Sequence, residues 1–140
     1  MIKVFIDASG WTTVVNANET QHNIAKEYFN SLLESRAKIY TSVIELDSAI
    51  TKIKNECGLI IAQEFNKLID EASLSAHLHI SWLARRNRRN SLKQFFSIKE
   101  SDVEMRHCII FEEVRKKRIN IIFSFDSRLK RFGIPLMPQG

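Results

Sequence analysis

The run Ile119-Asn120-Ile121-Ile122-Phe123-Ser124-Phe125 gives the strongest strand signal in the sequence, and Asp126 follows it directly. The run is apolar almost throughout, which is typical of a strand that is covered on both faces of a sheet. A second apolar run, Ile2 to Ile6, ends in the same way at Asp7, and Ala8-Ser9-Gly10 then breaks the strand pattern. Both acids are therefore expected at the carboxyl ends of buried strands.

Segments with the helical spacing of apolar residues separate the expected strands along the chain. Thr41 and Ser42 are cap-like residues that open one of these helices, and Cys57 and Gly58 end it. Strands that alternate with helices predict an α/β fold, a three-layer α/β/α sandwich around a central parallel sheet. The expected helices cover residues 21–34, 43–57, 59–71, a basic segment that reaches residue 96, and 103–117; further strands are expected at residues 38–40 and 77–82, and the last residues as an edge or a tail.

The composition is that of an ordinary globular protein. A chain of 140 residues can form one domain that buries roughly two thirds of the surface of its unfolded form, so residues 1–140 are expected to be a single domain. An apolar run of about 20 residues and a charged leader are both missing, which predicts a soluble, cytoplasmic protein with no membrane contact. The formal net charge of +5 favours a polyanionic partner, either nucleic acid or an acidic protein segment.

Three acids are candidates for one site at the carboxyl edge of the predicted sheet. Asp7 and Asp126 end apolar strands, and Glu45 lies just beyond the second strand, near the start of its helix. Carboxylates that share a partly buried site raise each other's pKa, and a hard divalent cation such as Mg²⁺ compensates their charge. The pattern therefore predicts a metal site. The alternative is that each acid caps a helix or lies in solvent.

Three segments together resemble the sequence motifs of PIN domains. Val4-Phe5-Ile6-Asp7-Ala8-Ser9 resembles the opening motif, in which the first metal-binding Asp follows a strand and Ser or Thr stands two residues later. Thr41-Ser42-Val43-Ile44-Glu45-Leu46 resembles the second motif, a Thr-Ser pair before the acidic residue on a helix. Ile121-Ile122-Phe123-Ser124-Phe125-Asp126, followed by Phe132-Gly133-Ile134, resembles the closing motif. The segments occur in the order of the family and span nearly the whole chain.

Within this family, the size and the single-domain layout look most like VapC-type toxins. The resemblance implies a PIN-like fold and a divalent-metal-dependent endoribonuclease that hydrolyses phosphodiester bonds in RNA. It also implies Mg²⁺ or Mn²⁺ as cofactor and a small antitoxin protein as partner. Asp7, Glu45 and Asp126 would hold the metal, and Ser9 and Ser124 would orient the carboxylates.

The sequence departs from the family pattern at one acidic position. PIN domains usually carry another Asp at the start of the helix before the last strand, about nineteen residues ahead of the final Asp. That register falls on His107, because the following Cys108 and Phe111 match the family's small and aromatic residues. Asp102 is the alternative if the helix begins earlier. A neutral imidazole can ligate Mn²⁺ but is a poor partner for Mg²⁺, so His107 leaves the choice of metal and the activity open.

Basic residues are concentrated in three places. Arg128, Lys130 and Arg131 follow Asp126 directly and are best placed to bind a substrate phosphate. The other two clusters are most simply solvated helix faces, although either could attract a phosphate backbone. They are formed by Arg85, Arg86, Arg88, Arg89 and Lys93, and by Arg115, Lys116, Lys117 and Arg118.

Two rival functions are consistent with parts of this pattern. A PIN-like module in which His107 has weakened or abolished cleavage would still bind RNA or an antitoxin. A receiver-like phosphotransfer domain also gathers acids at strand ends, but such domains usually show an adjacent acidic pair after the first strand. Asp7 stands between Ile6 and Ala8, so we place this second rival much lower. The sequence leaves the oligomeric state open, a homodimer included.

Overall fold

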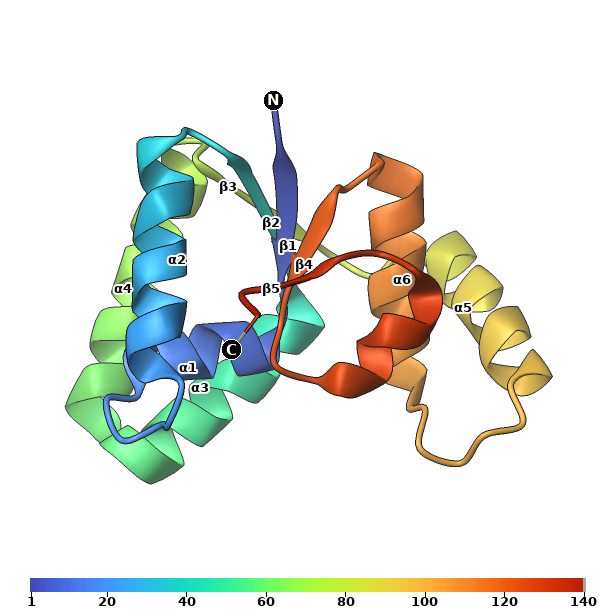
Figure 1. The fold of residues 1–140 in the computed structure, drawn as a ribbon, viewed down its shortest axis with the longest axis horizontal. Helices are drawn as coiled ribbons and strands as arrows, with labels where there is room; N and C mark the ends of the chain where they lie inside the picture. The colour runs from blue at the N-terminus through green and yellow to red at the C-terminus, as the bar shows by residue number, and fades with distance from the viewer. Residues whose placement is uncertain (140) are drawn as a thin grey trace.

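A parallel sheet forms the centre of the protein in the computed structural model, which describes residues 1–139. Within these residues the sheet has five strands in the order β3-β2-β1-β4-β5, and every neighbouring pair is parallel. Figure 1 shows β1 in the middle of the fold. The strands are β1 (Lys3–Ile6), β2 (Lys38–Ser42), β3 (Leu78–Ser81), β4 (Ile121–Phe123) and β5 (Leu136–Met137).

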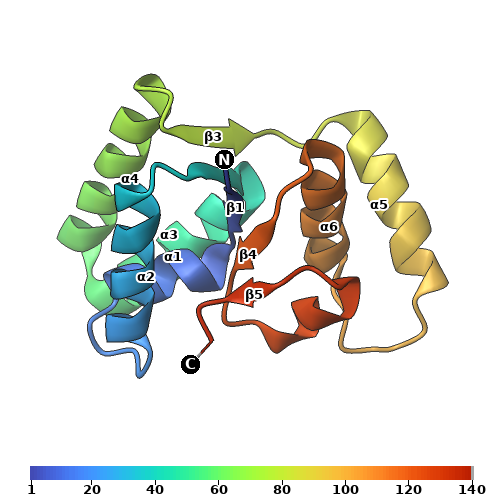
Figure 2. The same cartoon turned by 45° about the horizontal axis from the view of Figure 1, so that its top comes forward.

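Helices cover both faces of the sheet, because parallel strands need crossover connections. In Figures 1 and 2 the first four helices lie on one side, while α6 lies on the other side with α5 outside it. The helices are α1 (Ala8–Val15), α2 (His22–Glu34), α3 (Val43–Cys57), α4 (Leu59–Leu74), α5 (Arg85–Ser97), α6 (Met105–Lys117) and the 3₁₀ helix η1 (Ser127–Phe132).

The alternation of side chains along β1 divides the core into two parts. Val4 and Ile6 pack into the cluster beneath the first four helices, which also includes Trp11. Phe5 points to the opposite face and packs with Ile110 of α6. All three β1 side chains are completely buried, which is expected of a central strand covered on both faces.

The three-layer α/β/α sandwich with a central parallel sheet is confirmed. The expected strands and helices are present with shifts of a few residues at their ends, as the helix expected from residue 103 begins at Met105. The segment expected to form an edge or a tail contributes the short edge strand β5, paired with β4. None of the helices within residues 1–139 is both long enough and apolar enough to cross a membrane.

Candidate active site

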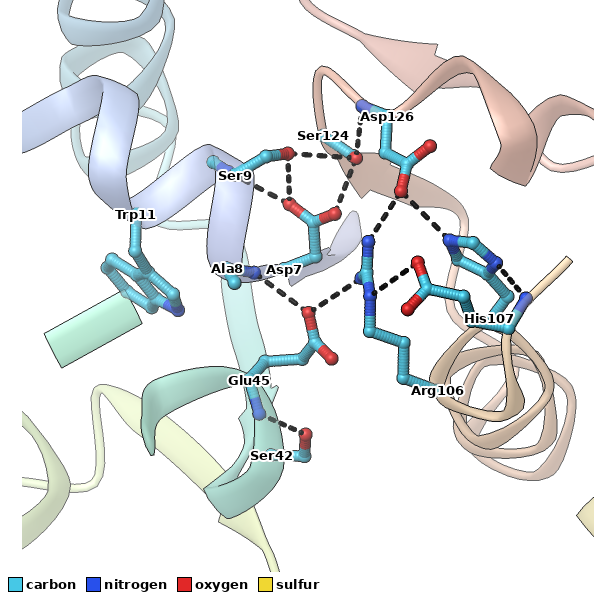
Figure 3. Close-up of polar contacts among 12 residues, drawn as sticks. Asp7, Ala8, Ser9, Trp11, Ser42, Glu45, Arg106, His107, Ser124 and Asp126 are labelled. Atoms are coloured by element: carbon cyan, nitrogen blue, oxygen red, sulfur yellow. Dashed lines mark hydrogen bonds and ion pairs between the residues drawn. The ribbon is translucent and has the colours of Figure 1, made fainter. Parts of the chain in front are cut away.

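The three predicted acids all lie at the starts of helices, at the carboxyl edge of the sheet. Asp7 is the N-cap of α1, Glu45 lies in the first turn of α3, and Asp126 is the N-cap of η1. The positive end of a helix dipole favours a carboxylate at each position. A place at a helix start and a place in a shared site are therefore compatible here, since the three helix starts converge on one edge of the sheet (Figure 3).

Asp7 is completely buried and is bound by neutral donors. Its Oδ1 accepts hydrogen bonds from the Ser9 hydroxyl at 2.7 Å and from the Gly10 amide at 2.8 Å, and its Oδ2 accepts one from the Ser124 hydroxyl at 2.6 Å. Burial raises the pKa of Asp7, and the hydrogen bonds from Ser124, Gly10 and Ser9 oppose that rise. Ser9 and Ser124 thus fix both oxygens of the carboxylate.

Gly10 allows the first turn of α1 to lie directly against the sheet. A Cβ atom at this position would come within 2.6 Å of the carbonyl oxygen of Phe123 and within 2.9 Å of the Ile6 side chain. A larger residue would therefore push α1 away from β4. Because Asp7 caps this turn, the close contact also sets the position of its carboxylate.

The Thr-Ser pair before Glu45 has two structural tasks. The Thr41 hydroxyl donates to the carbonyl oxygen of Ile6 at 2.7 Å and accepts from the indole of Trp11 at 3.0 Å, which ties β2 to β1 and α1. The Ser42 hydroxyl accepts the amide hydrogen of Glu45 at 3.3 Å and caps α3. Together they place the first turn of α3 beside Asp7.

Glu45 is almost completely buried, and its Oε1 accepts the hydrogen bonds that link it to the rest of the site. Oε1 accepts hydrogen bonds from the Ala8 amide at 2.9 Å and from the Arg106 guanidinium at 3.3 Å. Burial, reinforced by the neighbouring Asp7 carboxylate, raises the pKa of Glu45 to about 7. The repulsion between the Asp7 and Glu45 carboxylates thus adds to the rise in the pKa of Glu45.

Asp126 differs from the other two acids because its partners include charged groups. Two guanidinium groups reach it: Arg128 donates to both of its oxygens at 2.9 Å, and Arg106 donates to Oδ2 at 2.5 Å. Burial acts to raise the pKa of Asp126, but hydrogen bonds from Arg128 and His107 outweigh it and hold the pKa below its ordinary value. Asp126 is therefore ionised across the physiological range.

His107 is completely buried and uses both ring nitrogens. Its Nδ1 accepts the backbone amide hydrogen of Glu104 at 2.9 Å, so the ring proton lies on Nε2, which donates to Asp126 at 2.8 Å. The imidazole thus takes the place that Glu or Gln has in a capping box. In this arrangement His107 positions Asp126 and has no free nitrogen for a metal ion.

Arg106 is the site residue that the sequence analysis missed. Its guanidinium lies between two of the acids, donating to Glu45 and to Asp126, and its Nε is 3.7 Å from Glu104 (Figure 3). A local signal was available: a basic residue in the first turn of a helix opposes the helix dipole, so it needs a compensating partner. Neither spacing nor periodicity could have named that partner.

The donor chemistry of the site fits a hard cation, whereas its present spacing does not. Asp7, Glu45 and Asp126 supply carboxylate oxygens, which are the ligands that Mg²⁺ and Mn²⁺ favour. Yet within residues 1–139 no three acidic, histidine or cysteine side chains stand close enough together to hold a metal ion. The Arg106 guanidinium accounts for this, because it separates Glu45 from Asp126 and balances their charge.

The remaining predicted residues lie around this centre. Asp102 is exposed and contributes only its backbone carbonyl, which accepts a hydrogen bond from Arg128 at 3.2 Å. Of the two candidates for the family's further acidic position, His107 is the one whose side chain contacts Asp126. Lys130 is exposed on η1, and Arg131 pairs with Glu100 at 3.3 Å.

A comparison with solved structures finds proteins that share this fold over nearly the whole chain. No protein-family model matches the chain, and no curated protein matches it. The crystal structure of VapC20 from Mycobacterium tuberculosis, a toxin that cleaves the sarcin-ricin loop, matches with a TM-score of 0.78 and 21% identity. The match covers 94% of this chain and 95% of VapC20. The chain therefore has a PIN-like fold. The resemblance inferred from the three motifs is confirmed at the level of the fold.

Proposed function

We propose that the protein is an endoribonuclease of the VapC toxin kind, which hydrolyses phosphodiester bonds in RNA. The observation that carries this proposal is the convergence of Asp7, Glu45 and Asp126 at the carboxyl edge of a parallel sheet. Ligands of open parallel sheets bind at this edge. The likeness in fold to a toxin that cleaves RNA supports the substrate class.

Each residue of the centre has a distinct part in the proposed activity. Asp7, Glu45 and Asp126 would hold a divalent cation, Mg²⁺ or Mn²⁺, whose chemistry in such sites is to activate water and to stabilise charge on a scissile phosphate. Ser9 and Ser124 would keep the Asp7 carboxylate in one orientation, as their hydrogen bonds to it do. His107 would act through Asp126 as a positioning residue.

The basic residues beside the centre would bind the RNA backbone. Lys130 is exposed and would bind a phosphate directly, while Arg128 and Arg131 would have to bind a phosphate in addition to their present acidic partners. The formal net charge of +5 would attract RNA over a longer range. A small antitoxin protein would be the regulatory partner, and the cytoplasm would be the place of action.

The proposal is tested with purified protein and an RNA oligonucleotide that contains a sarcin-ricin loop, alongside total ribosomal RNA. We expect cleavage in the presence of Mn²⁺ or Mg²⁺ and none in excess EDTA. Asp47→Asn is the control for variants of the three site acids, because it also removes one carboxylate. Asp47 is an exposed acid two residues from Glu45 on the same helix. Absence of cleavage of every RNA with both metals would overturn the proposal.

A second candidate function is a PIN-like module that binds RNA or an antitoxin without cleaving. The observation in its favour is that Arg106, His107 and Arg128 all donate to Asp126, so the carboxylate has few free positions. RNA binding that persists without cleavage, measured by fluorescence anisotropy in Mg²⁺ and in Mn²⁺, would favour this module over the nuclease.

A further inference from the structure

The acidic centre contains its own cation. The Arg106 guanidinium donates to Glu45 through Nη1 at 3.3 Å and to Asp126 through Nη2 at 2.5 Å. These two acids come from segments 81 residues apart in the chain, α3 and η1, and no other side chain bridges them within residues 1–139. A guanidinium suits this task because its rigid fork presents several N–H donors in one plane.

The dipole of α6 gives no reason for a basic residue at this position. Arg106 is the second residue of α6, where the helix dipole disfavours a positive charge. Its side chain reaches the first turn of α3 and the start of η1, across the edge of the sheet. The carboxylates therefore provide the compensation that the helix does not.

Arg106 lies on the solvent side of the centre. Its side chain is 26% exposed, whereas Glu45 is 1% exposed, so the arginine enters from the solvent side. Glu104, which is 52% exposed, lies 3.7 Å from the Nε of Arg106 and also pairs with Arg128 at 3.0 Å. If Arg106 turned outward, it would lose its contacts with Glu45 and Asp126 and keep only the ion pair with Glu104 at the surface.

We propose that Arg106 is a resident counter-ion of the acidic centre, and that a divalent cation binds there only after Arg106 has turned outward toward Glu104. Two positive groups cannot share the space between Glu45 and Asp126 without strong repulsion. The apparent affinity for a cation is therefore reduced by the stability of the arginine contacts. This inference rests on the proposed function insofar as it takes these carboxylates to be the cation ligands.

The test is the affinity for Mn²⁺ in the absence of RNA, measured by isothermal titration calorimetry on the full chain after removal of metals with EDTA. Arg106→Gln is expected to bind Mn²⁺ at least about tenfold more tightly than the wild type, since the competing charge-assisted hydrogen bonds are lost. Arg115→Gln is the control, because Arg115 lies on the same helix and pairs with Glu112 outside the site. Its affinity should equal that of the wild type.

Two further variants keep the result interpretable. Arg106→Lys keeps the charge but loses the planar fork, so its affinity should lie between those of the wild type and Arg106→Gln. Arg106→Gln combined with Asp7→Asn should lose the gain, which would locate the Mn²⁺ at this centre. Circular dichroism confirms that each variant is folded before it is titrated.

A chemical rescue gives an independent readout. Guanidinium ion, added to Arg106→Ala at concentrations far below those that unfold proteins, should weaken Mn²⁺ binding by refilling the space. The same addition should leave the wild type unchanged, because its own guanidinium already lies there. No effect on Arg106→Ala would contradict a cation site between the two acids.

Equal Mn²⁺ affinity in the wild type and Arg106→Gln, or no binding by either, would overturn the inference. Its failure can be told from failure of the proposed function. If Arg106→Gln binds more tightly and no form of the protein cleaves RNA, only the nuclease proposal falls. If the wild type cleaves RNA and binds Mn²⁺ as tightly as Arg106→Gln, only the counter-ion inference falls.

Discussion

Asp7 and Asp126 lie just beyond the carboxyl ends of neighbouring parallel strands, β1 and β4, yet the two halves of the centre have opposite electrostatics. Asp7 is completely buried among hydroxyls and an amide, and its pKa is raised. Asp126 is bound by two guanidinium groups and an imidazole, and its pKa is lowered. The same residue type at the same edge thus behaves differently because of what packs beside it.

The difference follows from which helices cover each half. The Asp7 half, which includes Glu45, lies at the starts of α1 and α3, over the larger apolar cluster. The Asp126 half faces the start of α6, which brings Arg106 and His107. In the Asp7 half, two buried carboxylates therefore repel each other. In the Asp126 half, basic side chains of the same protein neutralise the carboxylate.

The largest expected effect comes from removing the charge of Asp7. Asp7→Asn should reduce kcat/KM for RNA by at least about 100-fold if the proposed function is right, because Asp7 would then be a metal ligand that contributes several kcal/mol to the transition state. The measurement is steady-state cleavage of an RNA oligonucleotide, with circular dichroism to show that the fold is intact. Asp47→Asn should retain full activity. Equal activity of Asp7→Asn and the wild type would place the active site elsewhere.

The second prediction concerns the pH dependence of stability in the Asp7 half. The folded protein raises the pKa of Glu45 from 4.5 to about 7, so it holds a proton that the unfolded chain releases. In EDTA, the contribution of Glu45 is complete below pH 4.5 and is lost as the pH rises toward 7, by on the order of 3 kcal/mol.

Glu45→Gln should therefore flatten the loss of stability between these pH values. The check is urea unfolding of the metal-free wild type and variant at a series of pH values. A wild-type protein whose stability does not fall across this window would show that Arg106 fully compensates Glu45 in solution.

The third prediction has the opposite sign and concerns the Asp126 half. Because the pKa of Asp126 is lowered in the folded protein, its contribution is complete above the ordinary Asp range and is lost progressively as the pH falls from there toward the lowered pKa. Asp126→Asn should destabilise the metal-free protein by about 1–2 kcal/mol at pH 7. The effect is no larger because Arg128 is partly exposed, so that solvent screens its attraction to Asp126.

This third difference should shrink in acid, and it should disappear only below the lowered pKa of folded Asp126. Urea unfolding at pH 7 and near pH 3 compares the variant with the wild type, and Asp102→Asn, an exposed acid, is the control. A destabilisation by Asp126→Asn that is the same at both pH values would mean that packing, and not charge, holds this half together.

The smallest expected effect concerns the exposed basic residues beside Asp126. Lys130→Ala should raise KM for RNA a few-fold and leave kcat unchanged, since one phosphate contact mainly contributes binding. The slope of log affinity against log salt should fall by about 0.7, the value for one phosphate of a single strand. Lys67→Ala, an exposed lysine on α4, is the control for net charge. An equal change in both variants would reduce the effect to long-range attraction.

The fold and the positions of the acids were accessible from the sequence. The apolar runs before Asp7 and Asp126 contain the strands β1 and β4, which helices cover on both faces, and short runs rich in β-branched and aromatic residues are typical of such strands. Thr41 and Ser42 mark the start of α3, and that start places Glu45. Each of these signals is contained in a few adjacent residues, so it can be recognised without the rest of the chain.

The charge balance of the centre was decided only by the tertiary structure. The sequence places Arg106 beside His107, but the contacts of Arg106 with Glu45 and Asp126 require α6 to pack against the sheet at one particular depth and rotation. The two uses of the His107 ring depend on the same packing. Distances between side chains far apart in the chain are set by how whole elements pack, and no local pattern encodes them.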